Sequence, residues 1–557
     1  MVAMPSHTSY CISLGPQSPG GVERGKKALP KEADFALHFL HPFTHPPSRV
    51  ESSRQMSSTH PLELPEVLSH IAKFVPLSRL LTYALVSRTW SQAFIPYIWR
   101  NIRLDEKWPT LPWSFSIHSH HVKSLEIYCT PTSEHAAMKC PNLESLTLTG
   151  CRQNLFSLQL IMGHPSLTRL QMHQLWSNYQ SGFWDEVLGF RHLKHLALSV
   201  VTFADDDVDK FWQLCTRMER LELSKLRLAS HGNLSSMEFP LIKEFRVGID
   251  QQEESSLYLD LIKRCPSLTA CNWKIGDREA DKHFVSGFVD LVASKTWSDL
   301  DSVDSASNFI TNEDLSKIME GMTQISILNI GSTWEAFGSN STELLRPRFS
   351  NLKELSLGYC ITAAGPLAQE IMSSCPMLEK LSIPHINASE IASGRPWVCL
   401  GLKKLSVRFC FRPATVGLLQ PLVFEQLSRL KRLEDLRIDG ISDDPTLRKM
   451  RLQETFDLRL CRGLGKLSTL RSLAVINFLD TDQKMGDEEV DWMIEHWTSL
   501  VEVNGTLNTS KQEFDEALRG RLEKHGVRTK AAERRISRHG DSPDFESDVE
   551  SDYDESI

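Results

Sequence analysis

The sequence of 557 residues lacks the uninterrupted run of about 18 to 20 apolar residues that a membrane-spanning helix needs. Its first residues, MVAMPSHTSYCISLGPQSPGG, lack the basic end and apolar core of a secretory signal. The twelve cysteines include no C-x-x-C pair, which argues against a zinc site or a disulfide framework and favours reduced thiols. We therefore expect no contact with a membrane and a location in the cytoplasm, the nucleus or both.

Motifs of the common enzyme classes are missing as well. The chain contains no G-x-x-x-x-G-K-[ST], G-x-G-x-x-G, H-E-x-x-H or G-x-S-x-G. The stretch HSHH at His118–His121 lies in an expected loop, where solvation is favoured over binding of a metal. Since no arrangement pairs a nucleophile with a base, we expect a chain that catalyses no reaction itself and uses no cofactor or metal.

Net negative charge is confined to one segment of the chain. The net charge is −8, and the last 17 residues, DSPDFESDVESDYDESI, carry eight acids and no base. The remaining 62 acids equal the 62 lysines and arginines, so the body of the chain is neutral. Nucleic-acid binding depends largely on neutralising phosphates, and a neutral body without a basic stripe argues against it.

Four segments of different character follow one another along the chain. Residues 1–58 are rich in Ser, Pro, His and Gly and are expected to be disordered. Residues 61–104 show helical, strongly apolar periodicity, and residues 120–510 show a repeated phrase. Residues 525–557 run from basic to acidic and are predicted to be a disordered tail.

The repeated phrase places three apolar residues at fixed positions, as in NLESLTL at Asn142 and NLKELSL at Asn351. Its first apolar residue recurs every 24 to 26 residues and then every 24 to 27, at Leu143, Leu167, Leu193, Met218, Ile242 and Leu268 and again at Ile325, Leu352, Leu378 and Leu402. The gap of 57 residues before Ile325 predicts a degenerate copy near Leu300. Looser spacings of 31 and 37 residues up to Leu433 and Leu470 predict insertions.

Each phrase alternates like a strand, and the residues after it often show helical periodicity, as in GPLAQEIMSSCP before Met377. Such units bury their apolar faces by stacking, with a curved parallel sheet inside and helices outside. The pattern resembles the leucine-rich repeat, and Cys140-Pro141, Cys265-Pro266 and Cys375-Pro376 resemble its cysteine-containing subtype. The predicted fold is therefore an α/β solenoid, a leucine-rich-repeat horseshoe, with cysteines that fill small apolar positions.

The helical block has more apolar surface than so short a segment can bury. Pro65 suits a first helical turn, with Val67, Leu68, Ile71 and Phe74 on one face. Ser78 is expected to cap a second helix, and Trp90 marks a third. A block of this size is not stable from its own core alone. Either it caps the first repeat, or a second polypeptide covers part of it.

The order of its residues resembles the F-box. The matching positions follow one another without insertion and are Leu64, Pro65, Leu68, Ile71, Leu80, Leu81, Leu85, Val86, Trp90 and Trp99. Ser87 stands where many F-boxes have a cysteine, and the usual acidic residue before the Leu-Leu pair is absent. The resemblance implies docking on a Skp-family adaptor and, through it, on cullin and RING subunits. Which of these positions face the adaptor and which form the core of the block stays open.

The residues between the buried positions of each strand are expected to face the inner side of the solenoid. These candidate target-binding residues are Arg169, Gln171, His173, His195, Arg220, Glu222, Arg246, Lys404, Arg408 and Arg437. Their signs alternate between neighbouring strands, so pairing across the sheet is an alternative to binding. A wall of mixed charge suits a polar segment of a target protein, whose identity the sequence does not give.

These features together predict the substrate-recognition subunit of an SCF-type ubiquitin ligase, a non-catalytic subunit that holds a target near the transfer machinery. Two other interpretations remain open. The chain could be a binding scaffold that does not direct degradation. It could also be a receptor for a small ligand, with the helical block as a solenoid cap.

Overall fold

The computed structural model describes residues 62, 64–75, 77–105, 114–150, 155–175, 182–228, 230–307, 309–331, 337–357, 364–438, 456–478, 483–510 and 512–530. The segment 1–58 and residues 531–557 of the predicted tail lie outside this part. The chain forms two compact units. The first comprises residues 1–100 and 110–121, and the second comprises residues 101–109 and 122–557.

The first unit is helical. It contains α2 (Pro65–Ala72), α3 (Leu77–Ala84), α4 (Arg88–Ile98), the short α5 (Phe115–His118) and the 3-10 turn η2 (Ser119–His121). Pro65 begins α2, where its missing N–H costs no hydrogen bond. The Ser87 side chain caps α4 by accepting a hydrogen bond from the backbone N–H of Trp90 at 3.2 Å. Ser78, predicted to cap the second helix, lies within α3, which begins at Leu77.

Aromatic rings fill much of the interior of this unit. Helix α4 packs against both α2 and α3, and Tyr83, Trp90 and Phe94 contact one another edge-on or tilted, with ring centroids 5.4 to 6.4 Å apart. The buried Trp99 stacks on His118 at 5.0 Å and lies 6.2 Å from Phe115. His118, one of the four residues of HSHH, therefore packs against a ring.

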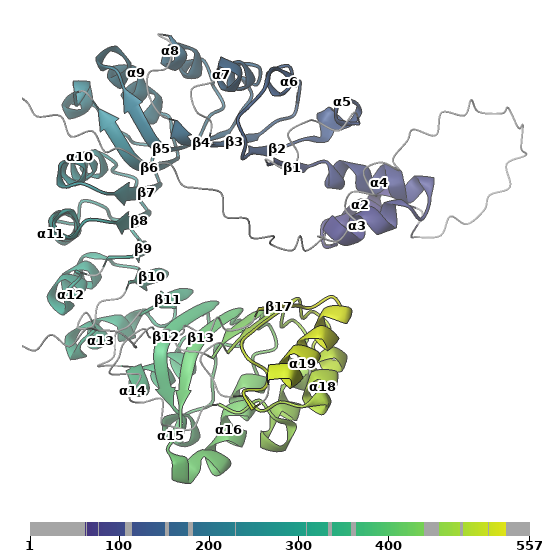
Figure 1. The fold of residues 1–557 in the computed structure, drawn as a ribbon. Helices are drawn as coiled ribbons and strands as arrows, with labels where there is room; N and C mark the ends of the chain where they lie inside the picture. Colours follow the sequence, from purple (N-terminus) through teal and green to yellow (C-terminus); the bar gives the residue numbers. More distant parts are fainter. Residues whose placement is uncertain are drawn as a thin grey trace, which may run out of the picture. The chain divides into compact units, whose positions relative to one another are not determined.

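The second unit contains one parallel sheet in which each strand pairs with the next along the chain. The first strands are β1 (Asn101–Leu104), β2 (Ser124–Ile127), β3 (Ser145–Thr149), β4 (Arg169–Leu175), β5 (His195–Phe203), β6 (Arg220–Leu228), β7 (Glu244–Ile249), β8 (Ala270–Ile275) and β9 (Ser302–Ser305). They continue as β10 (Ile327–Ile330), β11 (Glu354–Ser356), β12 (Lys380–Asn387), β13 (Lys404–Cys410), β14 (Asp435–Arg437), β15 (Val475–Asn477), β16 (Glu502–Asn504) and β17 (Arg528–Lys530). The sheet curves, with its strands on the inner side (Figure 1).

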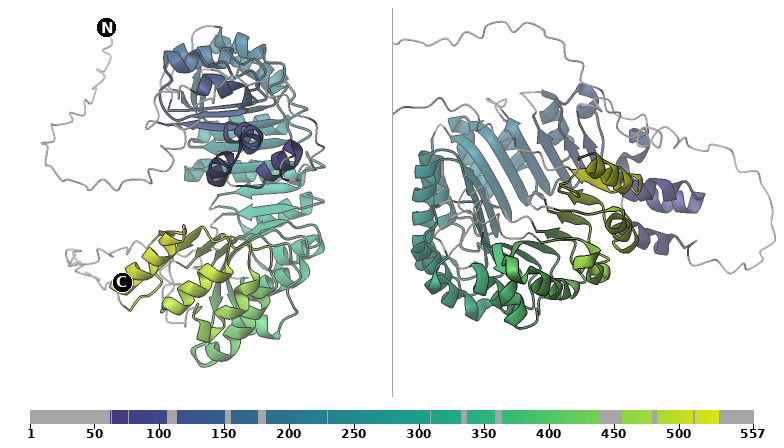
Figure 2. Two further views of the ribbon diagram at one scale, coloured as in Figure 1. Left: turned by 90° about the vertical axis from the view of Figure 1, so that its right-hand side faces the viewer. Right: turned by 60° about the horizontal axis from the view of Figure 1, so that its bottom comes forward.

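Helices return the chain between strands and cover the outer side of the sheet, as the teal to green part of Figure 2 shows. They are α6 (Ser133–Ala136), α7 (Leu155–Met162), α8 (Phe183–Leu188), α9 (Asp205–Cys215), α10 (Gln252–Lys263), α11 (Arg278–Ala293), α12 (Asn312–Gly321), α13 (Ser339–Leu345), α14 (Ala364–Ser374), α15 (Ala388–Ser393), α16 (Val416–Ser428), α18 (Asp487–His496) and α19 (Gln512–Lys524). Short 3-10 turns lie at η3 (Gly232–Ser236), η4 (Arg346–Arg348), η5 (Pro413–Thr415), η7 (Leu460–Arg462) and η8 (Leu464–Thr469). This alternation confirms the predicted α/β solenoid.

The repeated apolar positions build the core of this unit. All twelve, from Leu143 to Leu470, are buried. Strand β9 confirms the degenerate copy predicted near Leu300, since its Val303 pairs with Cys271 of β8 and Leu328 of β10. Burying such aliphatic side chains stabilises a fold by about 1.5 to 3 kcal/mol each.

Both ends of the sheet differ from the predicted boundaries. Strand β1 pairs with β2 but lies inside the range 61–104 assigned to the helical block. Strand β17 pairs with β16 and begins inside the range 525–557 predicted to be disordered, so the sheet extends past residue 510. Strand β17 lacks the repeated phrase, whereas β1 follows it with Trp99, Ile102 and Leu104.

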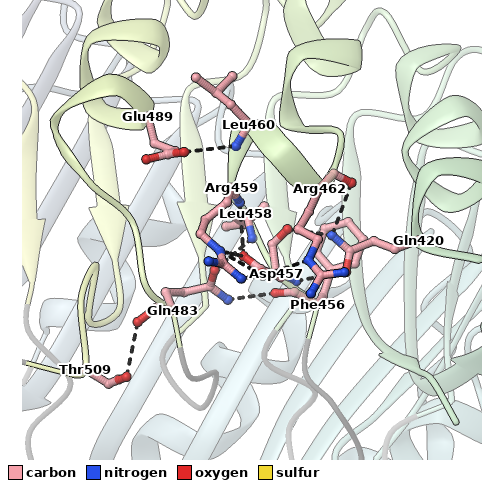
Figure 3. A network of polar contacts seen from close by, with 10 residues as sticks. All are labelled: Gln420, Phe456, Asp457, Leu458, Arg459, Leu460, Arg462, Gln483, Glu489 and Thr509. Atoms are coloured by element: carbon pink, nitrogen blue, oxygen red, sulfur yellow. Dashed lines mark hydrogen bonds and ion pairs between the residues drawn. The ribbon is translucent and has the colours of Figure 1, made fainter. Parts of the chain in front are cut away.

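Polar side chains hold the irregular repeat that follows β14, where insertions were predicted (Figure 3). The buried Gln420 donates to the carbonyl of Asp457 at 2.6 Å. The buried Gln483 donates to the carbonyl of Phe456 at 2.7 Å and accepts from the N–H of Leu458 at 2.9 Å. These amides satisfy backbone groups that a returning helix would otherwise satisfy internally.

Candidate protein-interaction surfaces

The structure divides the F-box-like positions of the first unit into core and surface. Leu68, Leu80 and Trp99 are buried, Ile71, Leu81 and Trp90 are half-buried, and Leu64, Pro65, Leu85 and Val86 are exposed. The contrast is large within one motif, since Leu80 is 4% exposed whereas Leu85 is 64% and Val86 62% exposed.

Leu85 and Val86 lie in the tight connection between α3 and α4. Their backbone N–H groups donate to the carbonyls of Thr82 at 3.2 Å and Tyr83 at 3.1 Å, which closes the end of α3. Ser87 then starts α4 through its cap. The connection is thus held by backbone hydrogen bonds, and its two apolar side chains project without being needed for the core.

Sequence reasoning missed three further exposed apolar residues, Leu62, Phe74 and Leu77. The apolar periodicity places Phe74 on the packed face of α2, but that helix ends at Ala72. The Phe74 side chain is 76% exposed and lies near the His70 ring. Together with Leu64, Leu85 and Val86, these residues form what we call the exposed apolar set. The set places six exposed large apolar side chains within residues 62–86.

The inner face of the second unit carries the predicted target-binding residues at aligned positions. Arg169, His195 and Arg220 are register neighbours on β4, β5 and β6. Gln171, Glu222 and Arg246 lie in the adjacent row, with Ala197 between the first two. His173 follows on β4, whereas Lys404, Arg408 and Arg437 lie on β13 and β14. The structure therefore brings the candidates together in two groups, on β4–β7 and on β13–β14.

The group on β4–β7 is rich in arginine. Burial, followed by the positive charges of Arg169, Arg220 and Arg246, lowers the pKa of His195 to about 3. Burial also lowers the pKa of Arg169, with a further contribution from Arg220. Arg220 pairs with Glu244 of the next strand at 3.0 Å, one of the cross-strand pairs that alternating signs had indicated. His195 is thus a neutral polar group flanked by cations.

Ion pairs across or along the strands also occur in the group on β13–β14. Arg437 contacts Asp435 of its own strand at 3.3 Å, and Lys380 on the neighbouring β12 contacts Glu354 at 2.6 Å. Lys404 is exposed and makes no ion pair with any residue that the structure describes. Pairing therefore accounts for some of the candidates and leaves others available to a partner.

The repeat cysteines lie in the core. Cys140, Cys265 and Cys375 are buried, and burial raises the pKa of the Cys140 thiol to about 11 and that of Cys375 to about 12. Among the described residues, no three His, Cys, Asp or Glu side chains are grouped so as to hold a metal ion. None of the described helices is long and apolar enough to cross a membrane.

No protein-family model matches the chain, and no curated protein matches it. Among solved structures, the complex of Rad7 and Elc1 in yeast is similar, with 14% identity and a TM-score of 0.34. The match covers 59% of this chain and 81% of that chain, and a score this low carries no argument about function. What the fold itself defines is the class, an α/β solenoid of the leucine-rich-repeat type.

Proposed function

We propose that this chain is the substrate-recognition subunit of an SCF-type ubiquitin ligase. The first unit docks on a Skp-family adaptor, which links it to the cullin and RING subunits. The inner face of the repeats holds a target protein. The chain catalyses no step itself and acts by holding the target close to the transfer machinery. A tethered target meets that machinery at a high effective concentration, which accelerates transfer.

The observation that carries the proposal is the exposure of Leu85 and Val86 at F-box-like positions. Leu68, Leu80 and Trp99 belong to the same motif and form the core of the unit. The motif therefore contains residues that stabilise the fold and residues that are exposed to a partner. Transfer of a leucine or valine side chain from water to an interface stabilises a complex by about 1.5 to 3 kcal/mol. The exposed apolar set thus offers apolar surface that an interface can bury.

The proposed target site is the inner face, where polar and charged side chains stand on a rigid sheet. Arg169, Arg246 and Lys404 have no ion pair with a described residue and are free to meet acidic groups of a target. Charge complementarity of this kind favours specificity and rapid association. A polar protein segment is therefore the expected ligand.

The test compares the wild-type chain with Leu85→Ala/Val86→Ala in cells, by proximity labelling and by the half-life of the labelled proteins. We expect the variant to lose the adaptor and cullin from its labelled neighbours and to lengthen the half-life of at least one retained target. If the adaptor is lost but no target changes its half-life, the chain is a scaffold. If neither changes, the proposal is wrong, and ligand-dependent thermal stabilisation of the chain alone would favour a small-ligand receptor.

A further inference from the structure

The inner face of the last six strands carries more positive than negative charge. On β12–β17, the side chains at inner positions include two acids, Asp435 and Glu502, and six cations, Lys380, Lys404, Arg408, Arg437, Arg528 and Lys530. The buried positions between them, such as Leu405 and Leu436, point to the core. Lys380 also pairs with Glu354 of the neighbouring β11 at 2.6 Å, which leaves a surplus of three positive charges among these described positions, in a body whose net charge is zero.

The acids at the described inner positions do not balance the cations there. Glu502 alone faces both Arg528, at 2.9 Å, and Lys530, at 3.0 Å. Hydrogen bonds from Asn504 and Lys530 lower the pKa of Glu502 and so keep it ionised. One carboxylate shared by two largely exposed cations leaves positive charge available at the end of the sheet.

Lys404 is the clearest unpaired cation of this face. Its register neighbour on β14 is Asp435, but that carboxylate pairs with Arg437 of its own strand. Next to it, His385 is the register neighbour of Arg408, and burial followed by the charge of Arg408 lowers the pKa of His385. His385 therefore stays neutral at pH 7 and adds no charge to the surface.

The compensating negative charge lies in the same chain. Residues 541–557 carry eight acids and no base, and ten residues separate them from Lys530 at the end of β17. Ten extended residues span about 33 to 36 Å. Strand β12 lies five strand spacings from β17, or about 24 Å along the sheet. The acidic segment therefore reaches every strand of this surface.

We propose that the inner face of β12–β17 is a binding surface for acidic segments and that its occupant in the free chain is residues 541–557. Attachment to β17 gives the segment an effective concentration on the order of millimolar, so that weak ion pairs suffice for occupancy. A target that uses this part of the inner face then has to displace the segment. This inference does not depend on adaptor docking, because the helical unit takes no part in it.

The test uses the full-length chain in two forms, wild type and a form whose eight tail acids are replaced by the corresponding amides. The probe is a fluorescent peptide with the sequence of residues 541–557, and its anisotropy gives the affinity. We expect the peptide to bind the amide form at least about ten-fold more tightly than the wild type at low salt, because the native tail competes. The difference should shrink in about 0.5 M salt, where surface charges are screened.

Variants in the amide form locate the site. Lys404→Glu/Arg437→Glu changes two exposed cations of the proposed surface and should weaken peptide binding by about ten-fold or more. Lys263→Glu/Lys282→Glu makes the same charge change at two exposed positions of the outer helices α10 and α11 and should leave binding within about two-fold. Circular dichroism checks that each variant is folded.

Two results would overturn the inference. Equal binding of the peptide to the wild type and the amide form would show that the tail does not occupy the surface. An equal loss in both pairs of variants would show general attraction and no defined site. A carbodiimide adds a direct check, since it joins carboxylates to amines in contact and should link Lys404 to residues 541–557 in the wild type at low salt.

Discussion

The imidazole of His164 accepts a hydrogen bond from the backbone N–H of Cys140, with 3.1 Å between Nε2 and the amide nitrogen. Its other nitrogen, Nδ1, donates to the carbonyl of Leu160 at 2.7 Å. The ring is buried and joins two successive repeats, and burial lowers its pKa. Only the neutral ring fits, because Nε2 has to be an acceptor.

Protonation of His164 at acidic pH should therefore lower the stability of the second unit. The folded-state pKa lies below the usual value of 6.5, so the contribution of the ring is complete above that pH and declines as the pH falls toward the folded-state pKa. We expect the melting temperature of His164→Gln to depend less on pH between 7.5 and about 5 than that of the wild type. The amide of glutamine can keep both hydrogen bonds without titrating. Parallel curves for the two proteins would contradict this role.

The amide of Gln483 should stabilise the irregular repeat after β14. Gln483→Leu leaves the carbonyl of Phe456 and the N–H of Leu458 buried without these partners, and each such loss costs about 1 to 3 kcal/mol. We expect the free energy of unfolding to fall by about 2 to 4 kcal/mol in urea titrations. The exposed neighbour Lys484 is the control, and Lys484→Gln should change it by less than about 0.5 kcal/mol. Equal effects would contradict the network of Figure 3.

The last helix is held by a buried ion pair. Asp515 accepts from Arg519 at 2.6 Å and from the backbone N–H groups of Leu507 and Asn508 at 2.6 and 3.0 Å. Asp515→Ala leaves the guanidinium buried and should cost about 3 to 5 kcal/mol of unfolding free energy. Arg521 on the same helix pairs with Asp487 and Asp491 at the surface, and Arg521→Ala should cost no more than about 1 kcal/mol. Hydrogen exchange of the amides of α19 measures both, and a small effect at Asp515 would refute the assignment.

Within the helical unit, two neighbouring leucines should respond in opposite ways. Leu80→Ala removes a buried side chain and should lower the free energy of unfolding of this unit by about 2 to 5 kcal/mol. Leu85→Ala removes an exposed one and should change it by less than about 0.5 kcal/mol. Circular dichroism in urea measures both. Similar losses would mean that Leu85 belongs to the core.

The spacing of the sequence predicts the repeats well because each copy buries the same three apolar positions. Even the degenerate copy near Leu300 could be placed by counting, and Val303 confirms it as β9. The end strand β17 could not be placed because it lacks the phrase, and β1 was assigned to the helical block although Trp99, Ile102 and Leu104 follow the phrase. The phrases at Leu193 and Met218 place the starts of β5 and β6, but not their length, because both strands continue past Val200 and Lys225 at φ values of 57° and 54°, a conformation that no sequence pattern of non-glycine residues indicates.

The interaction surfaces were harder to predict than the fold. Leu80 and Leu85 are both leucines of the same motif, and only the packing of α3 on α4 decides which one is buried. Phe74 follows the apolar periodicity of α2 but lies beyond its end. The inner-face positions followed from strand alternation, yet their ion pairs depend on register, as Arg220 and Glu244 show.

The central claim is that the exposed apolar set binds a Skp-family adaptor, and the most direct test is the affinity of the purified full-length chain for that adaptor by calorimetry. Leu85→Ala/Val86→Ala should weaken binding by at least about ten-fold, since each side chain contributes apolar burial. The matched control is Leu418→Ala/Leu422→Ala on α16, where the side chains are 76% and 40% exposed, and it should stay within about two-fold of wild type. Equal affinities of all three proteins, or no binding by any of them, would contradict the account.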